Sequence, residues 1–375
     1  MELKSDFATF LSDIRLTDKQ VDDLKMGHET LRERLRNDEE IKRIIVSDFL
    51  QGSYRRYTAV RPNGDKRADV DVIIVTNMKE KEYPPTKAMD KFIPFLEKYY
   101  KDKYNKQGRS FGIELSYVDL DLVITSAPSE AEKAIYESAA VRTDYDIYKT
   151  QDWRLNEYWL DIPSRLTANA SILLDKAKKQ EEWKTNPLRI PDREVNCWES
   201  THPLAQIQWT RDKNSRCNNH FVNVVKALKW WRLENYEEPK QPKGYPLERL
   251  VGECCPDDIN SVAEGITLTL ENIVSQYAVK VCLESKPFLC DYGVPEHDVF
   301  KRITSTEFAA FYEQAKEGAQ IARSALDSSD RSESGNLWIK LLGKRFPKPP
   351  DDSGNKNGGF TKPDCFAIPM GGRFA

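Results

Sequence analysis

The sequence lacks the features that mark several large classes of protein. No apolar run approaches the roughly eighteen residues that a membrane-spanning helix needs. The first residues, MELKSDFATFLSD, contain no hydrophobic stretch of the kind found in signal peptides. Seven cysteines, an odd number in a chain of 375 residues, do not indicate a disulfide framework. Together these absences predict a cytoplasmic protein with reduced thiols and no membrane contact.

A strong basic excess, the usual mark of a protein that holds long nucleic acids, is also missing. Lys and Arg number 57 and Asp and Glu number 60, which gives a formal net charge of −3. This balance argues against an obligatory nucleic-acid partner. It leaves a nucleotide substrate open, because phosphates carried by Mg²⁺ need only a few local cations.

What is present is a soluble globular composition, with 39% hydrophobic and 31% charged residues. The pattern predicts a mixed α/β first half and a mostly helical second half. Helix is expected over 1–48, with a capping box from Thr17 to Gln20, and over 86–104, with a kink at Pro94. Strands are expected over 69–76 and 111–125. Further helices are expected over 166–183, 220–236, 259–280 and 305–327.

Two pairs of aspartates lie in the expected strands. Asp69 and Asp71 are two residues apart in DVDVIIVT, and Asp119 and Asp121 repeat this spacing in VDLDLVIT. On a strand, both members of such a pair lie on one face. Carboxylates this close repel one another unless a cation lies between them, and Mg²⁺ prefers such oxygen ligands. The spacing predicts a two-metal site of Asp69, Asp71 and Asp121, with Asp119 as the alternative third ligand. A solvated, acidic strand edge is the competing interpretation.

A Gly-Ser pair, Gly52-Ser53, lies seventeen residues before Asp69. Glycine lets the backbone approach a phosphate closely, and the N–H groups that follow it can donate to phosphate oxygens at a helix start. Arg55 and Arg56 come next. A Gly-Ser pair alone is a common helix-ending turn, but together with the downstream acids it predicts a phosphate cradle.

The order of these motifs resembles the nucleotidyltransferase superfamily shared with DNA polymerase β. LQGSYRRYT, DVDV and a hydrophobic strand with a third Asp follow its pattern of h-G-S, [DE]-h-[DE]-h and h-D-h. GSYRRYT and RADVDVIIV more closely resemble the cGAS/DncV-like nucleotidyltransferases (CD-NTases) of bacterial CBASS antiphage systems. VVKALKWWR, DYGVPEHDVFKRIT and LWIKLLGKRFP resemble later segments of that family, so the likeness covers residues 1–346. In KGYPLERL this chain has Gly244 where the family often has Ser.

The resemblance implies a two-lobed, polymerase-β-like fold of the α/β plus α class. A mixed-sheet catalytic lobe with a long N-terminal spine helix is expected over 1–195. A helical lobe is expected over 196–346, with the active site in the cleft between the lobes. Residues 347–375 contain five Pro and five Gly, which predicts a flexible tail.

The resemblance also assigns roles to individual residues. It implies that Asp69, Asp71 and Asp121 bind two Mg²⁺ ions, which Mn²⁺ can replace. It further implies that Gln51, Gly52 and Ser53 hold the donor triphosphate, helped by a lysine of the helical lobe. Lys229 is the preferred lysine, and Lys226, one turn earlier, is the competing candidate.

The implied activity is the template-independent joining of nucleoside triphosphates, ATP and one or more of GTP, CTP and UTP, into a cyclic di- or trinucleotide second messenger. Two alternatives stay open. One is another polymerase-β-type nucleotidyltransferase that makes linear oligonucleotides or tails RNA. The other is a non-catalytic nucleotide or RNA sensor on the same fold. CBASS operon partners that join the tail, which ends at Ala375, to other proteins are a further expectation.

Overall fold

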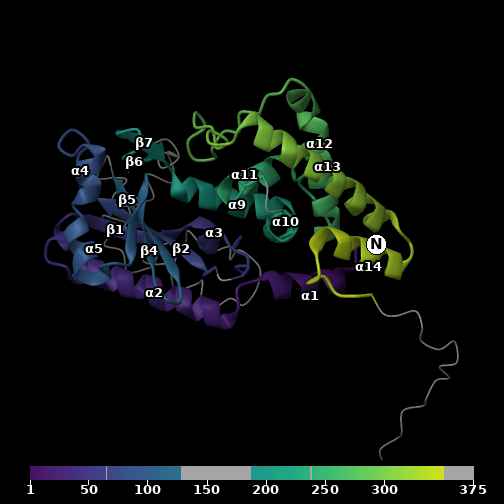
Figure 1. Ribbon diagram of the computed structural model, residues 1–375, viewed down its shortest axis with the longest axis horizontal. Coiled ribbons are helices and arrows are strands. Elements are labelled where there is room, and N and C mark those ends of the chain that lie inside the picture. The colour runs from purple at the N-terminus through teal and green to yellow at the C-terminus, as the bar shows by residue number, and fades with distance from the viewer. Residues whose placement is uncertain (65, 128–186, 237–238, 350–375) are drawn as a thin grey trace, which may run out of the picture.

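The computed structural model describes residues 1–64, 66–127, 187–236 and 239–349, and it shows a sheet lobe beside a helical lobe (Figure 1). The strands of the sheet lobe are β1 (Ile45–Gln51), β2 (Asp69–Thr76), β3 (Tyr104–Lys106), β4 (Ser110–Glu114), β5 (Asp119–Ser126), β6 (Leu188–Asp192) and β7 (Cys197–Thr201). Its helices are α2 (Asp18–Asn37), the 3₁₀ turn η1 (Ile41–Arg43), α3 (Gly52–Arg55), α4 (Pro85–Asp90) and α5 (Ile93–Tyr100). The helical lobe contains α9 (Pro203–Arg216), α10 (Phe221–Asn235), α11 (Tyr245–Cys254), α12 (Val262–Cys282), α13 (Ser305–Asp327) and α14 (Arg331–Leu342), and α1 (Lys4–Ile14) packs on it.

Within the described ranges, seven strands form one mixed sheet. Its order is β1-β2-β5-β4-β3, and the β6–β7 hairpin joins it at the end of β5. β2 and β5 are parallel, with Asp69 beside Asp119 and Asp71 beside Asp121. Residues paired in this way direct their side chains to the same face of a sheet. Both aspartate pairs found in the sequence therefore lie on one face.

The two faces of the sheet belong to different cores. On one face, Val70, Val72 and Ile74 are fully buried against α2, α4 and α5. On the other face, Ile73 and Val75 join a core that continues into α1 and the helices of the helical lobe. Burial of each such side chain contributes about 1.5–3 kcal/mol. The lobes are thus held together by a shared apolar core on the face of the sheet that carries the aspartates.

The long helix expected over 1–48 is wrong as a single element. α1 ends at Ile14, and α2 begins after Thr17, which has extended backbone angles. The Thr17 hydroxyl accepts a hydrogen bond from the Gln20 backbone, and the Gln20 side chain accepts one from the Thr17 backbone. The capping box is therefore confirmed, and it explains the break because a cap begins a new helix. Residues 45–51 form β1, an edge strand of the sheet.

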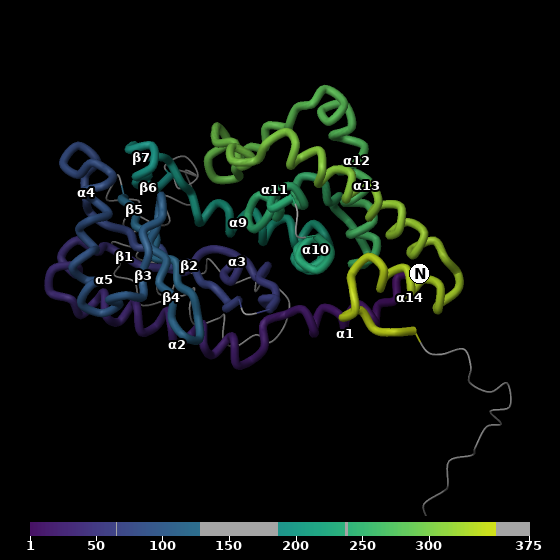
Figure 2. The backbone as a smooth tube through the Cα atoms, in the orientation of Figure 1, coloured from purple at the N-terminus to yellow at the C-terminus, as the bar shows by residue number. Residues whose placement is uncertain are grey.

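The two helices on either side of this break lie against different lobes. α2 runs beneath the sheet, whereas α1 reaches the helical lobe beside α14, where the N-terminus lies (Figure 2). The Met1 amino group donates to the carbonyl oxygen of Ala325 at 2.6 Å. The first 37 residues therefore bridge both lobes.

Two further expectations of single elements are wrong for local reasons. The strand expected over 111–125 is two antiparallel strands, β4 and β5, joined by a turn in which Leu115 N–H donates to Val118 O at 3.0 Å. The helix expected over 86–104 is divided into α4 and α5, and its last residue belongs to β3. Pro94 lies in the first turn of α5, where its missing N–H leaves no hydrogen bond unmade.

The helical lobe agrees closely with expectation. The helices expected over 220–236, 259–280 and 305–327 are α10, α12 and α13. Side chains cap two of them, since Ser261 Oγ accepts from Glu264 N–H and Thr304 Oγ1 accepts from Glu307 N–H. The helix expected over 166–183 and nearly all of the expected tail lie outside the described residues. Across the described ranges, no helix is long and apolar enough to cross a membrane.

Candidate active site

A cleft of about 1040 Å³ lies between the lobes. Its sheet-lobe wall carries residues from the end of β1, the start of α3 and the paired strands β2 and β5: Gln51, Gly52, Ser53, Arg56, Asp69, Asp71 and Asp121. Its helical-lobe wall carries residues of α9, α10 and α11 and of the segment before α13: Gln206, Lys229, Tyr245, Glu248 and Asp291. Most residues singled out in the sequence are thus brought to one cavity.

Asp69, Asp71 and Asp121 supply a concentrated negative charge to the cleft. Burial, and then the charges of Asp69 and Asp121, raise the pKa of Asp71 to about 7. Burial, and then the charge of Asp69, raise the pKa of Asp121 to about 6. Burial and like-charge repulsion disfavour the ionised forms of these carboxyl groups more than the nearby charge of Arg56 favours that of Asp71.

The structure separates Asp121 from its alternative, Asp119. Asp119 accepts a hydrogen bond from Arg67 Nε at 2.7 Å, and the same guanidinium lies 3.7 Å from Glu114. Asp121 lines the cleft, whereas Asp119 is not among the described residues that line it. The cation partner of Asp119 is already in place, which favours Asp121 as the third acid of the site.

The donor set fits a divalent cation. Within the described ranges, no three His, Cys, Asp or Glu side chains converge closely enough to hold a metal ion as they stand. The three aspartates nevertheless supply the hard carboxylate oxygens that Mg²⁺ prefers. A cation among them would also remove the like-charge repulsion that raises their pKa values.

Gly52 is required at its position for two independent reasons. Its φ of 78° lies in the left-handed region that favours glycine. A Cβ built on Gly52 would lie 1.6 Å from Asp71 Oδ2, so no side chain fits there. The β1–α3 turn can therefore pack directly on the Asp71 carboxylate only because residue 52 is glycine.

The two lysine candidates differ in position. Lys229 lines the cleft, and its ammonium donates to Glu248 Oε1 at 3.0 Å. Lys226 is buried and is not one of the described residues that line the cleft. Burial, and then the charges of Arg15 and Lys229, lower the pKa of Lys226 to about 7. The geometry favours Lys229 as the residue that meets a ligand.

Sequence reasoning missed Glu248, which holds both Lys229 and Arg56 in the cleft. Glu248 also accepts from Arg56 Nε at 3.1 Å. Burial alone would raise the pKa of Glu248, but the charges of Arg56 and Lys229 hold it at about 2. Glu248 lies four residues after Gly244 in KGYPLERL, and no local pattern there marks it as the partner of Arg56, which is 192 residues away.

A second polar link crosses the cleft beside the Gly-Ser turn. Gln51 Nε2 donates to Gln206 Oε1 at 3.0 Å, and Gln206 Nε2 donates to Asp291 Oδ2 at 2.9 Å. The Asp291 carboxylate in turn accepts from the backbone of Gly293 and Val294. The residue that precedes Gly52 is thereby tied to the helical lobe.

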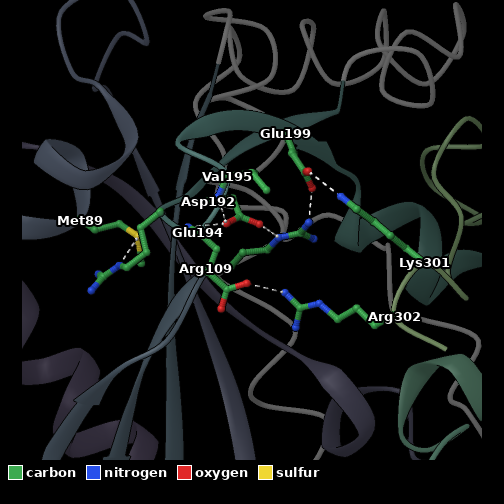
Figure 3. A network of polar contacts seen from close by, with 9 residues as sticks. Met89, Arg109, Asp192, Glu194, Val195, Glu199, Lys301 and Arg302 are labelled. Carbon is green, nitrogen blue, oxygen red and sulfur yellow. Dashed lines mark hydrogen bonds and ion pairs between the residues drawn. The ribbon is translucent and has the colours of Figure 1, made fainter. Parts of the chain in front are cut away.

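Ion pairs close one rim of the cleft (Figure 3). Arg109, the residue directly before β4, contacts Asp192 at 2.7 Å and also contacts Glu199. Glu199 pairs with Lys301 at 3.3 Å, and Glu194 pairs with Arg302 at 3.2 Å. Since Lys301 and Arg302 belong to the segment before α13, these pairs join the sheet lobe to the helical lobe.

Comparison with known proteins decides the family. Residues 1–130 match the family described as Second Messenger Oligonucleotide or Dinucleotide Synthetase domain. A cyclic AMP-AMP-GMP synthase of Enterobacter hormaechei subsp. hoffmannii (strain UCI 50) is 50% identical to this chain over the whole of both. The chain belongs to the cGAS/DncV-like nucleotidyltransferases. It is a nucleotidyltransferase that synthesises a cyclic oligonucleotide, as the resemblance implied.

Solved structures of CD-NTases share the fold. The DncV cyclic AMP-GMP synthase of Vibrio cholerae has a TM-score of 0.59 at 14% identity, over 90% of this chain and 93% of that one. The Bradyrhizobium diazoefficiens CD-NTase CdnG, solved in complex with GTP, has a TM-score of 0.63 at 10% identity, over 90% and 95%. The two-lobed fold expected of this CD-NTase is thereby confirmed.

Proposed function

We propose that this CD-NTase joins two adenylate units and one guanylate unit, from ATP and GTP, into a cyclic trinucleotide that signals in antiphage defence. The observation that carries the proposal is the 50% identity to a cyclic AMP-AMP-GMP synthase along the full length of both chains. A probable synthase of the same product from Salmonella paratyphi B is 49% identical over the same span. The cyclic AMP-AMP-AMP synthase of an Acinetobacter species is only 30% identical.

Two walls of the cleft hold the donor nucleotide in this proposal. Gly52 and Ser53 offer backbone N–H groups and a hydroxyl to the triphosphate, and Gln51 fixes the start of that turn through Gln206. Lys229 approaches from the helical lobe with a positive charge. The triphosphate is thus held between the lobes, with its α-phosphate beside the three aspartates.

We assign Asp69, Asp71 and Asp121 as the ligands of two Mg²⁺ ions, or of Mn²⁺ in their place. Such ions, when bound, neutralise the triphosphate and lower the pKa of the attacking ribose hydroxyl. The support for this assignment is the donor set itself, three carboxylates whose pKa values are raised first by burial and then by repulsion from neighbouring carboxylates. Asp119 is set aside because Arg67 already balances its charge.

The reaction repeats one step. A ribose hydroxyl of the acceptor attacks the α-phosphorus of the donor, the bond to the β-phosphate oxygen breaks, and pyrophosphate leaves. Asp121 is assigned to receive the hydroxyl proton, because its carboxylate lines the cleft beside the proposed position of the α-phosphate. After two joinings, the linear intermediate turns end for end so that its own hydroxyl attacks its own triphosphate.

The test is incubation with labelled ATP, GTP, CTP and UTP and Mg²⁺, followed by phosphatase treatment and chromatography. The expected product resists phosphatase, requires ATP and GTP together, and contains adenylate and guanylate in a ratio of two to one. A phosphatase-sensitive product would indicate a linear oligonucleotide instead. A product formed from ATP alone at the same rate would contradict the use of GTP.

The matched variant carries Asp69→Asn together with Asp71→Asn. It is expected to fold, with an unchanged circular dichroism spectrum, and to form no product. Product at the wild-type rate would contradict the assignment of these two acids.

The action of CBASS partners on the tail and on Ala375 stays a prediction, because residues 350–375 lie outside the described ranges. Mass spectrometry of the protein co-expressed with its operon neighbours tests it, and an unmodified C-terminus would argue against it.

A further inference from the structure

One carboxylate joins two cations that line the cleft from opposite lobes. Glu248 of α11 contacts Arg56 of the sheet lobe at 3.1 Å through Oε2 and Lys229 of α10 at 3.0 Å through Oε1. All three side chains line the cleft. The exposed fractions of the Arg56 and Glu248 side chains are only 4% and 6%, and that of Lys229 is 12%. We call these three residues the Glu248 triad.

Each cation of the triad lies at a different part of the proposed triphosphate site. The backbone N–H of Arg56 donates to Gly52 O at 3.0 Å, so Arg56 is fixed to the Gly-Ser turn. Its guanidinium also lies over the ring of Tyr245, 5.1 Å from the centroid, in the first turn of α11. Lys229 lies on the opposite wall. Glu248 is therefore the group that sets the distance between the Gly-Ser turn and the lysine.

The charges of the triad do not cancel. Two cations and one carboxylate leave one net positive charge, and Lys229 carries two further N–H donors beyond the one given to Glu248. A long, flexible lysine loses less of its freedom on binding a ligand when a carboxylate already holds it in place. The arrangement can thus hold Lys229 ready while leaving donors for a polyanion.

We propose that Glu248 is a positioning residue for the donor triphosphate, which holds Lys229 and Arg56 at the spacing that the phosphates require. This inference rests on the function proposed above and adds to it a residue that has no contact with the reacting atoms. Glu248 acts through the two cations, so its effect falls on the phosphates and not on the base or ribose.

The test compares Glu248→Gln with Glu253→Gln. Glutamine has the same shape but can accept from only one cation while its amide N–H groups repel the other. Glu253 lies on the same helix, pairs with Arg249 at 2.7 Å, and is not among the described residues that line the cleft, so it is a matched control. Binding of α,β-methylene-ATP and of AMP is measured by calorimetry with Mg²⁺ present.

Glu248→Gln is expected to weaken the triphosphate analogue about tenfold, the effect of one hydrogen bond to a charged group, and to leave AMP within about twofold. The KM for ATP is expected to rise by a similar factor with kcat changed less. Glu253→Gln is expected to match the wild type in every measurement. Glu248→Asp keeps the negative charge but shortens the side chain by one methylene. Its affinity for the triphosphate analogue is expected to lie between those of Glu248→Gln and Glu253→Gln.

Three results separate the explanations. Equal losses for the triphosphate analogue and AMP would show a merely structural role and overturn the inference, as would no loss for either. If Glu248→Gln does not fold, as shown by its melting curve, Glu248→Asp supplies the same comparison, and a loss confined to the triphosphate analogue supports the inference. A wild type that binds the analogue no better than AMP would instead contradict the proposed function on which the inference depends.

Discussion

The floor of the cleft comprises the Glu248 triad, Gly52 and the three aspartates of the proposed metal site, and its rim comprises the ion pairs of Arg109 and Arg302. The ion pairs of the floor are buried, whereas the Glu194–Arg302 pair of the rim is exposed to solvent. At the floor, Arg56, Lys229 and Glu248 are almost inaccessible to solvent. At the rim, the side chain of Arg302 is 71% exposed and that of its partner Glu194 is 60% exposed. Both sets of contacts join the sheet lobe to the helical lobe.

The difference in burial decides what each set does. An exposed pair contributes about 0–1 kcal/mol, because water and salt screen it and two long side chains must be ordered. Removing one partner of a buried pair costs about 3–5 kcal/mol, since a charge is left without compensation. The buried pairs therefore hold the residues of the proposed triphosphate site in place, whereas the exposed pair of Glu194 and Arg302 can break at little cost. The predictions below test this contrast from the largest expected effect to the smallest.

The sharpest contrast lies between two aspartates on one strand. Asp121→Asn is expected to lower the rate of cyclic product formation by more than about 100-fold, because it removes a ligand of the proposed metal site. Asp119→Asn is the matched control, because it removes a carboxylate whose charge Arg67 already balances. Its rate of product formation is expected to stay within about threefold of the wild-type rate. The measurement is product formation under saturating ATP and GTP. Equal losses in both variants would show that the two acids are not separated as the structure indicates.

Gly52→Ala is the next largest disturbance of the floor. The new Cβ would lie 1.6 Å from Asp71 Oδ2, on a backbone with φ of 78°. The Asp71 side chain or the β1–α3 turn must shift, and with the strain at this φ the expected loss is about 2–3 kcal/mol in the free energy of unfolding. Gly64→Ala is the control, since its φ of 63° is similarly left-handed but no atom lies within 4 Å of its added Cβ. Urea unfolding of both variants checks the difference, and equal losses would assign the whole effect to φ.

The sequence predicts the features of the cleft that depend on neighbouring residues, and it does not predict those that depend on residues far apart in the chain. The spacing of Asp69 and Asp71 sufficed to place them on one face, because alternation along a strand is a local property. The same holds for the capping box at Thr17. The choice between Asp119 and Asp121 was only a preference, because it depends on Arg67, which lies fifty-two residues from Asp119.

The Glu248 triad lay beyond sequence reasoning for the same reason. Arg56 and Glu248 are 192 residues apart, and no local pattern distinguishes a buried glutamate on α11 from an exposed one. The split of 111–125 into two strands was also missed, because alternation continues on both sides of the turn and only the pairing of β4 with β5 reveals the reversal. Periodicity predicts the elements, and tertiary pairing decides where they break and which charges meet.

The charge of the floor should also appear as a pH dependence of stability. The pKa of Asp71 is about 7 in the folded protein, whereas the ordinary pKa of an aspartate in an unfolded chain is about 3.9. Between these values the folded state binds more protons than the unfolded state, so the free energy of unfolding falls as pH rises from about 4 to 7. Because the side chain is partly accessible, the expected fall is on the order of 1–2 kcal/mol and not the full shift.

The measurement is thermal unfolding in metal-free buffer from pH 5 to pH 8. Asp71→Asn is expected to flatten the dependence and, near pH 8, to be more stable than the wild type while being inactive. Added Mg²⁺ is expected to raise the melting temperature of the wild type more than that of Asp71→Asn. A stability that rises with pH in metal-free wild type would contradict the assignment of a raised pKa to this group.

The rim should give the smallest effects, graded by burial within one network (Figure 3). Arg109→Met is expected to cost about 1–2 kcal/mol in the free energy of unfolding, because it leaves the Asp192 side chain, only 3% exposed, with backbone donors alone. Arg302→Met is expected to cost less than about 0.5 kcal/mol, since both members of its pair are in water.

Salt sharpens this last comparison. Raising the ionic strength from 0.05 to 0.5 M should erase the small cost of Arg302→Met, since exposed charges are screened over about 10 Å at 0.1 M. The cost of Arg109→Met should persist, because the Asp192 side chain is only 3% exposed and dissolved ions cannot approach it closely. If both costs vanish together in salt, Arg109 behaves as a surface residue, and the boundary between strong buried pairs and weak exposed pairs would lie deeper in the cleft.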